Sequence, residues 1–303
     1  MSRIESQPSR FLSPGVLDKV ERLELLAREA VEGYLAGRHR SPYHGFAVEF
    51  HEHREYVPGD EVKHIDWKVY ARSERYYVKQ YEEETNLIAT LLLDASESMR
   101  YSSTGITKLE YGAFAAACLS YLILKQTDSV GLGVFDREVR DVLPPGTHLD
   151  HIYRVLSLLE RTKPERKTDV ASVFHQFAGT LRRRGLVIVI SDLFDDVERV
   201  VNGLQHLVFA GQEVIVFHVL DPAELTFPFA GLMQFKGLEG QGNLLIEPRR
   251  LRDNYLAAFE AFCTRLRHAC ERNRVEFVQI DTATPIDVTL TGFLTKRMAM
   301  LRR

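Results

Sequence analysis

The sequence is poor in cysteine, in charge of one sign and in long hydrophobic runs. Three cysteines in 303 residues cannot form the disulfide framework that holds small secreted domains together. The 39 basic and 42 acidic residues leave a net charge of -3, so the basic footprint of a nucleic-acid-binding protein is missing. No apolar run approaches the roughly 20 residues of a transmembrane helix, and the polar first residues lack the apolar segment of a signal peptide. We therefore expect a cytoplasmic protein with no nucleic-acid partner and no direct membrane insertion.

The amino-acid composition is that of a folded protein with more than one structural part. Hydrophobic residues make up 45% and charged residues 27% of the chain, which excludes wholesale disorder and fibrous repeats. In residues 1–85, apolar residues at steps of three and four predict a helix over Pro14–Ala36. Alternating stretches such as Phe46–Phe50 and Tyr76–Tyr81 predict paired strands. We expect an N-terminal helix followed by a small β-rich subdomain.

Residues 86–303 alternate apolar strands with amphipathic helices. The strands run from Leu87–Leu93 to Val275–Ile280, and a typical helix covers Lys108–Lys125. Strands that are apolar throughout are buried on both faces, which is typical of a parallel sheet covered by helices. Right-handed crossovers then predict a doubly wound, mostly parallel α/β domain. Leu232–Phe235 and Asn243–Ile246 predict a hairpin inserted into it.

Carboxylate and hydroxyl side chains follow the predicted strands at their carboxyl ends, where an open α/β sheet binds its ligands. Asp94, Ser96 and Ser98 alternate along one loop after the first strand, so their side chains can converge. Thr168 and Asp192 arrive from neighbouring loops at the same edge. Oxygen donors of this kind are the ligands that Mg²⁺ prefers. The sequence therefore predicts a magnesium site at this edge.

The Asp-x-Ser-x-Ser string, with a later threonine and a later aspartate, resembles the metal-ion-dependent adhesion site of von Willebrand factor type A domains. The resemblance implies that Ser96, Ser98 and Thr168 coordinate Mg²⁺, or alternatively Mn²⁺ or Ca²⁺, directly. It implies that Asp94 and Asp192 hold the ion directly or through water. The last coordination position is left for an acidic residue of a partner protein.

A second stretch, within residues 37–85, resembles the signature of a bacterial family, domain of unknown function family fifty-eight. The signature residues in this chain are Arg54, Tyr56, Gly59, Asp60, Asp66, Trp67 and Arg72. Family members carry this segment just before a type A domain, and the resemblance covers residues 37–220. Their association with MoxR-type AAA+ ATPases implies such an ATPase, or its client, as the partner. Many relatives begin with transmembrane helices, whereas this chain resembles the short soluble form.

The signature residues have two possible roles, a structural network or a partner-binding surface. Asp60 can close the Pro-Gly-Asp turn, and Trp67 can anchor the segment against the larger domain. Arg54 and Arg72 can pair with Asp60 or Asp66.

The loop residues also have a simpler interpretation as helix caps. Serine and aspartate after Asp94 can bond backbone amides in a strand-to-helix turn. In the same way Thr168 can cap the helix near Val170, and Asp195 can cap the helix after Asp192.

The combined reading is a Mg²⁺-dependent protein-interaction module, not an enzyme, acting as an adaptor or co-chaperone for a MoxR-type ATPase. A metal-dependent phosphohydrolase is the first alternative, because Asp94 stands where a phosphoryl-transfer nucleophile would stand. Against it, Ser96 holds the place of the second carboxylate, and no lysine has a clear claim to clamp phosphate. A metal-free structural adaptor is the second alternative.

Overall fold

The computed structural model describes residues 10–21, 49–57, 65–73, 75–82, 87–165, 170–181, 183–236 and 243–301. The chain divides into two compact units, Leu35–Asn86 and a larger unit made of Met1–Tyr34 with Leu87–Arg303. Our expected boundary at residue 85 groups the N-terminal helix with the β-rich segment. In the structure the helix belongs instead to the larger unit. The ring of Phe11, for example, packs edge-on against Phe114 with centroids 5.0 Å apart.

The smaller unit contains an antiparallel pair of strands, β1 (Glu49–Glu55) and β2 (Tyr77–Glu82), and a short helix α3 (Trp67–Ser73). The second strand follows the predicted stretch, while the first extends further along the chain to Glu55. The register shifts between Phe50 and Glu52, as at a β-bulge. Alternation of apolar and polar residues therefore located a hairpin, but it did not reveal the short helix.

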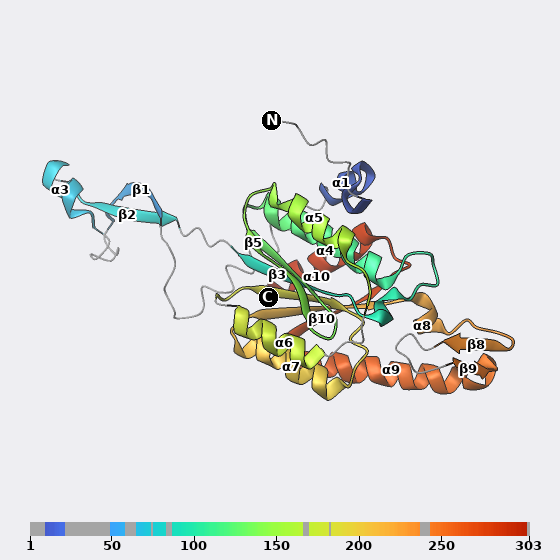
Figure 1. The fold of residues 1–303 in the computed structure, drawn as a ribbon. Helices are drawn as coiled ribbons and strands as arrows, with labels where there is room; N and C mark the ends of the chain where they lie inside the picture. Colours follow the sequence, from blue (N-terminus) through green and yellow to red (C-terminus); the bar gives the residue numbers. More distant parts are fainter. Residues whose placement is uncertain are drawn as a thin grey trace. The chain divides into compact units, whose positions relative to one another are not determined.

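The larger unit is a layered α/β structure (Figure 1). Its strands are β3 (Ile88–Asp94), β4 (Ser129–Phe135), β5 (Val139–Gly146), β6 (Leu186–Ser191), β7 (Glu213–Leu220), β8 (Met233–Lys236), β9 (Asn243–Ile246) and β10 (Val275–Asp281). Its helices are η1 (Arg10–Leu12), α1 (Pro14–Glu21), η3 (Glu97–Arg100), α4 (Lys108–Lys125), α5 (His151–Arg161), α6 (Val170–Thr180), α7 (Val197–Phe209), α8 (Pro222–Thr226), α9 (Pro248–Arg272) and α10 (Ile286–Leu301).

Six of these strands form one sheet in the order β10-β7-β6-β3-β4-β5. All neighbours are parallel except β5, which pairs with β4 in antiparallel fashion. This confirms the prediction of a mostly parallel sheet flanked by helices. The strands β8 and β9 form a separate antiparallel hairpin, as the sequence predicts.

Helices cover both faces of the sheet because its central strands are mostly apolar on both faces. Leu92 and Val189 belong to the core cluster that includes residues of α6, α7 and α9. On the opposite face, Leu93 and Ile190 lie under Gly112 of α4, where an added Cβ would approach both side chains to 3.0 Å. Each fully buried aliphatic side chain stabilises the fold by roughly 1.5–3 kcal/mol. Figure 1 shows the two helical layers.

The strand order places a topological switch point between β3 and β6. From β3 the chain crosses to β4 on one side, and after α6 it returns to β6 on the other side of β3. Loops that leave neighbouring strands in opposite directions open a crevice beyond the carboxyl ends of those strands, where ligands bind in this class of fold. Asp94 ends β3 and Ser191 ends β6, so both residues lie at this crevice.

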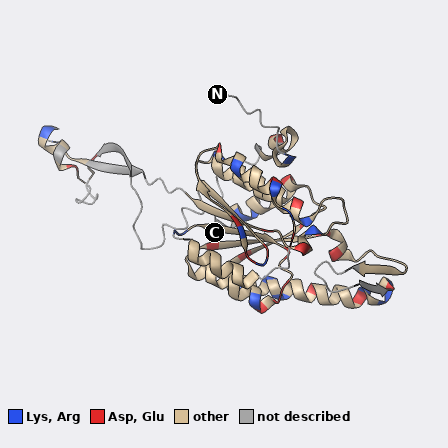
Figure 2. Ribbon diagram, viewed as in Figure 1, with Lys and Arg blue, Asp and Glu red and all other residues tan. Residues whose placement is uncertain are grey.

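Two surface features of the described residues complete the fold. No helix among them is long and apolar enough to cross a membrane. Acidic and basic residues are interspersed along the helices of the larger unit (Figure 2). This mixture accords with the small net charge of the chain.

Candidate functional site

Asp94 is the last residue of β3, and it organises the loop that follows. Its Oδ1 accepts a hydrogen bond from the backbone N–H of Ser96 at 2.8 Å, and its Oδ2 accepts one from the Ser191 hydroxyl at 2.5 Å. The side chain is buried, with 1% exposed. Asp94 therefore joins the ends of β3 and β6 across the switch point.

Ser96 and Ser98 bring two hydroxyls together beside Asp94. Their Oγ atoms lie 3.1 Å apart. Adjacent ligands of an octahedral Mg²⁺, each 2.0–2.1 Å from the ion, are themselves about 3 Å apart. Ser96 precedes η3, but its side chain makes no capping hydrogen bond there. The capping interpretation thus describes Asp94, which holds the backbone of the turn, better than it describes the Ser96 hydroxyl.

Asp192 reaches the same site from the loop after β6. Its Oδ1 accepts a hydrogen bond from the backbone N–H of Phe194 at 3.2 Å, and Ser98 also bonds its side chain. Leu193, between them, has a left-handed backbone with φ of 47° and donates its N–H to the Ser191 hydroxyl at 2.8 Å. A leucine in this conformation costs roughly 1–2 kcal/mol. Such strain is concentrated at functional loops, and here it turns the chain sharply after Asp192.

Lys108 is a member of the site that the sequence reasoning missed. Its Nζ donates to Asp192 Oδ2 and to Glu224 Oε1, each at 2.7 Å, and its side chain is only 2% exposed. A signal was available, because Lys108 begins α4 directly after the Thr107 cap. A cation in the first turn of a helix opposes the helix dipole, so it calls for an anionic partner nearby.

A third loop, after β7, supplies that partner. Asp221 caps α8 and accepts hydrogen bonds from the backbone N–H of Ala223 and from the backbone and hydroxyl of Ser103. Glu224 closes the capping box by accepting the Asp221 N–H at 2.8 Å. The sequence prediction did not include α8, yet this single turn places Glu224 on Lys108.

The charges of the site are strongly coupled. Burial, followed by the charge of Asp192, raises the pKa of Asp94 to about 7. Burial by itself would raise the pKa of Asp192 too, but the Lys108 ammonium and the hydrogen bonds from Lys108, Ser98 and Phe194 together hold that pKa below its usual range. Burial would lower the pKa of Lys108, and the carboxylates of Asp192 and Glu224 raise it instead. Asp192 is therefore an anion with Lys108 as its cation, while Asp94 gains or loses its proton around neutral pH.

The donor set fits a hard divalent cation. The side chains of Asp94, Ser96, Ser98 and Asp192 offer only oxygen, which suits Mg²⁺. Within the described ranges no group of three or more acidic, histidine or cysteine side chains is placed to hold a metal. An ion at this edge would therefore depend on hydroxyls and water besides the two aspartates. Thr168, the fifth predicted ligand, lies outside the described residues, as does the alternative that it caps α6.

One capping prediction for this region is wrong. The helix after Asp192 begins at Val197, and its N-cap is Asp196, whose Oδ1 accepts from the N–H groups of Glu198 and Arg199. Asp195 instead accepts the N–H of Asp196 at 2.8 Å. Two consecutive aspartates make the cap ambiguous in the sequence, and the sharp turn at Leu193 moves the helix start one residue further on.

The signature residues of the smaller unit can be placed in part. The Asp66 carboxylate accepts from the N–H of Val69 in the first turn of α3 at 3.3 Å, and the Tyr56 ring lies 6.3 Å from that of Tyr76. These contacts are those of a structural network. Trp67 meets Tyr70 edge-on but is 56% exposed, and Arg72 is also exposed.

The structure does not describe the side-chain contacts of three signature residues. Arg54 pairs with Val78 in the β1–β2 ladder, and its side chain is not described. Gly59 and Asp60 lie outside the described residues. Whether Trp67 anchors the segment to the larger unit stays a prediction.

Comparison with known proteins identifies one family and several relatives. The family described as "Protein of unknown function DUF58" matches residues 52–264. Uncharacterized proteins of Mycobacterium bovis and Mycobacterium tuberculosis are each 26% identical over 255 residues, which cover 82% of this chain and 79% of theirs.

Among solved structures, the conserved hypothetical protein BatB from Bacteroides thetaiotaomicron aligns at 16% identity and a TM-score of 0.47, covering 71% of this chain and all of that chain. An aerotolerance-related membrane protein from Bacteroides fragilis aligns at 18% identity and a TM-score of 0.48, covering 70% of this chain and all of that chain. At TM-scores below 0.5, these likenesses do not establish a shared fold.

Proposed function

We propose, for a chain that belongs to the DUF58 family of proteins of unknown function, a Mg²⁺-dependent protein-binding activity at the carboxyl edge of the sheet. The observation that carries the proposal is the convergence of Asp94, Ser96, Ser98 and Asp192 at the switch point between β3 and β6. These are four of the five ligands that the resemblance to a metal-ion-dependent adhesion site implies; the fifth, Thr168, lies outside the described residues. Mn²⁺ and Ca²⁺ are alternative ions for the same oxygens.

The chemistry of the donors explains why an acidic partner is expected. Ser96 and Ser98 are neutral ligands, and Asp192 shares its charge with Lys108. A bound Mg²⁺ would keep part of its positive charge and retain open positions, which a carboxylate of another protein can fill. The role of the chain is then to hold the ion and orient its open side. In this proposal the protein is a binding module and not an enzyme.

The partner follows from the family resemblance. We propose that the chain acts in the cytoplasm as an adaptor or co-chaperone for a MoxR-type AAA+ ATPase, binding the ATPase or its client. The small net charge of the chain, and the mixture of acidic and basic residues along the helices of the larger unit (Figure 2), support recognition through one bound cation, since they provide no broad field for steering.

The direct test is titration calorimetry with Mg²⁺ and Mn²⁺. We expect one binding site in the wild-type chain and at least tenfold weaker binding in Ser96→Ala, because one hydroxyl ligand is lost. Ser157→Ala is the matched control, since Ser157 is exposed on α5, and it should bind like the wild type. Equal affinity in the wild type and Ser96→Ala would remove the proposed site.

The partner is tested by capture on the immobilised full chain. A purified MoxR-type AAA+ ATPase should be retained in Mg²⁺ and released by EDTA, and it should not be retained by Asp94→Ala. Retention that survives both EDTA and Asp94→Ala would favour the metal-free structural adaptor. Absence of retention by the wild type in Mg²⁺ would exclude the ATPase as a direct partner.

One observation favours a second candidate, the metal-dependent phosphohydrolase. Lys108 lies beside Asp192 at the same edge as Asp94, so a lysine is present where sequence reasoning found none for a phosphate clamp. However, Lys108 already contacts two carboxylates, those of Asp192 and Glu224. His218, the imidazole beside Asp192, is buried, and burial lowers its pKa to about 4. Turnover of a generic phosphate ester that disappears in Asp94→Asn would establish this alternative.

A further inference from the structure

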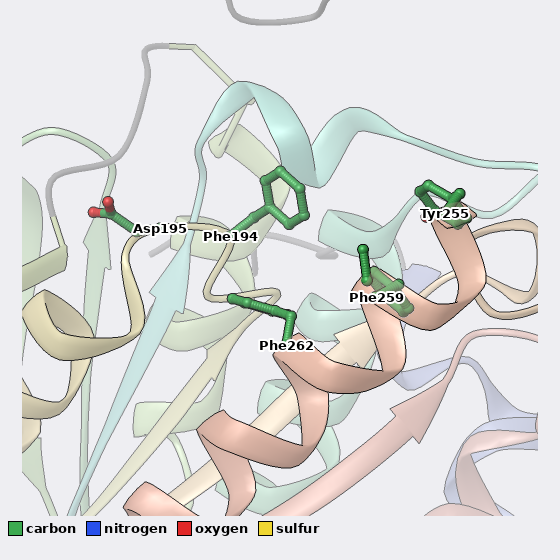
Figure 3. A pocket seen from close by; sticks show the side chains of 6 residues that line it. Phe194, Asp195, Tyr255, Phe259 and Phe262 are labelled. Atoms are coloured by element: carbon green, nitrogen blue, oxygen red, sulfur yellow. The ribbon is translucent and has the colours of Figure 1, made fainter. Parts of the chain in front are cut away.

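An apolar pocket lies next to the proposed cation site in the larger unit. It has a volume of about 360 Å³ and is lined by Phe194, Asp195, Tyr255, Ala258, Phe259 and Phe262. Figure 3 shows the rings of Phe194, Tyr255, Phe259 and Phe262 around this space, with the Asp195 carboxylate directed away from them. The four rings come from the loop after β6 and from α9. The pocket surface is therefore suited to an apolar group.

The pocket wall is tied to the cation site through Phe194. Its backbone N–H donates to Asp192 Oδ1 at 3.2 Å, so the same short loop carries a cation-site carboxylate and an aromatic wall. The Phe194 ring is 60% exposed and lies 5.9 Å from the ring of Phe262. An aromatic side chain left this open beside the proposed cation site is suited to anchor a partner.

Two further contacts connect the pocket to the same site. The His218 ring lies 6.4 Å from Phe262, and its Nε2 is 2.9 Å from the backbone carbonyl oxygen of Asp192. On the other side, Tyr255 packs against the same small apolar cluster as Leu225, the residue that follows Glu224 in α8. One pocket wall therefore adjoins the helix that carries a carboxylate partner of Lys108.

We infer that the pocket binds a large apolar side chain of the partner that stands next to the acidic residue captured at the cation site. The inference rests on the proposed function and specifies the partner: an extended segment in which Phe, Leu or Met adjoins Asp or Glu. A volume of about 360 Å³ is at the small end of ligand pockets, so it accommodates one bulky side chain and not a folded surface. The loop from Asp192 to Phe194 then binds both parts of the segment.

The experiment selects short random peptides displayed on phage against the immobilised full chain in the presence of Mg²⁺. The blocking variant is Ala258→Met, which places a larger side chain in the pocket. Its matched control is Ala257→Met, since Ala257 is exposed on α9 and does not line the pocket. Alanine and methionine are both good helix formers, so neither change should alter α9. Phe194→Ala is a second variant, which removes an exposed wall and keeps the backbone bond to Asp192.

We expect the wild type and Ala257→Met to enrich peptides that pair an apolar with an acidic residue, released by EDTA. The affinity of one such peptide should fall at least tenfold when its apolar residue becomes glycine. The same peptide should bind Ala258→Met and Phe194→Ala at least tenfold more weakly than it binds the wild type. In these two variants, replacing the apolar residue of the peptide by glycine should reduce its affinity little further, because the pocket contact is already lost.

Other outcomes separate the inference from the proposed function. EDTA-sensitive acidic peptides without an apolar preference, or with equal binding to Ala258→Met, would overturn the pocket and leave the cation site intact. Apolar peptides that bind without Mg²⁺ or an acidic residue would also overturn the paired site. Absence of any Mg²⁺-dependent enrichment would count against the proposed function itself.

Discussion

Two clusters at opposite edges of the same sheet each hold one buried cation between two carboxylates. At the carboxyl edge the members are Lys108, Asp192 and Glu224; at the amino edge they are Arg297, Glu213 and Glu276. The cations are 2% and 8% exposed. By the identity of the groups alone, the two clusters would be taken for equivalent structural ion pairs.

Their surroundings differ. At the amino edge the two glutamate side chains are 37% and 18% exposed, so water screens the extra negative charge. At the carboxyl edge the Glu224 side chain is 20% exposed, but Asp192 is only 3% exposed, and a further carboxylate, Asp94, is buried beside it. Three serine hydroxyls also point into this group. Negative charge that is concentrated away from water is costly unless it binds a proton or a cation, and this distinguishes the proposed cation site from a structural ion cluster.

Removing the cation of each cluster is the strongest way to test this difference. Without Mg²⁺, Lys108→Met should lower the free energy of unfolding by about 3–5 kcal/mol, because two carboxylates lose their ammonium. Arg297→Met should cost about 2–3 kcal/mol, since its glutamates are more exposed. Urea unfolding with and without Mg²⁺ measures both. We expect Mg²⁺ to restore much of the stability of Lys108→Met and none of that of Arg297→Met, and equal responses would make the clusters equivalent.

Mg²⁺ should also stabilise the wild-type chain, by a smaller amount. An ion that binds only the folded state adds about 2.7 kcal/mol when its concentration is a hundred times the Kd. This gain should be absent in Asp94→Asn and retained in Glu213→Gln, which removes a carboxylate from the amino-edge cluster only. Thermal unfolding at several Mg²⁺ concentrations gives the comparison. A gain that Glu213→Gln abolishes and Asp94→Asn keeps would place the ion at the wrong edge.

The sequence predicted the sheet better than the site because the two depend on different ranges of interaction. Burial on both faces leaves β4 and β6 with one serine each and otherwise without polar side chains, and a capping box starts α4. These elements could therefore be predicted from local sequence pattern. The short helices α3 and α8 have too few residues for a periodic pattern.

Local sequence patterns also cannot predict contacts between residues that lie far apart in the chain. Lys108 meets Asp192 and Glu224 across 84 and 116 residues, and only the order of strands brings these three loops together. Asp94, Ser96 and Ser98 were accessible because one loop carries them all. The cation itself, and Thr168 as its ligand, remain predictions.

The pH dependence of stability offers the finest comparison, between two buried aspartates at opposite edges. Asp128 at the amino edge is 4% exposed and accepts the N–H of Leu87 at 2.8 Å; burial raises its pKa to about 6, while that hydrogen bond lowers it. An unfolded aspartate titrates near 3.9. Between about pH 4 and pH 6 the folded chain thus keeps a proton that the unfolded chain has lost, so this contribution to stability is full below pH 4 and is lost as the pH rises through 6.

Asp128→Asn should remove that slope, since asparagine still accepts the Leu87 N–H and carries no charge. We expect the variant to match the wild type below pH 4 and to exceed it by about 1–2 kcal/mol at pH 7, after allowance for partial screening and for the added amide hydrogens. Asp94, whose pKa is about 7, adds a similar loss of stability with rising pH, and this loss extends to higher pH than that of Asp128. Because the proposed cation would replace the proton only at Asp94, Mg²⁺ should flatten the Asp94 part of the urea-unfolding pH profile and leave the Asp128 part unchanged. If Mg²⁺ changed neither contribution to the pH profile, or changed the contribution that Asp128→Asn removes, Asp94 would be no more than a second buried aspartate without a cation site.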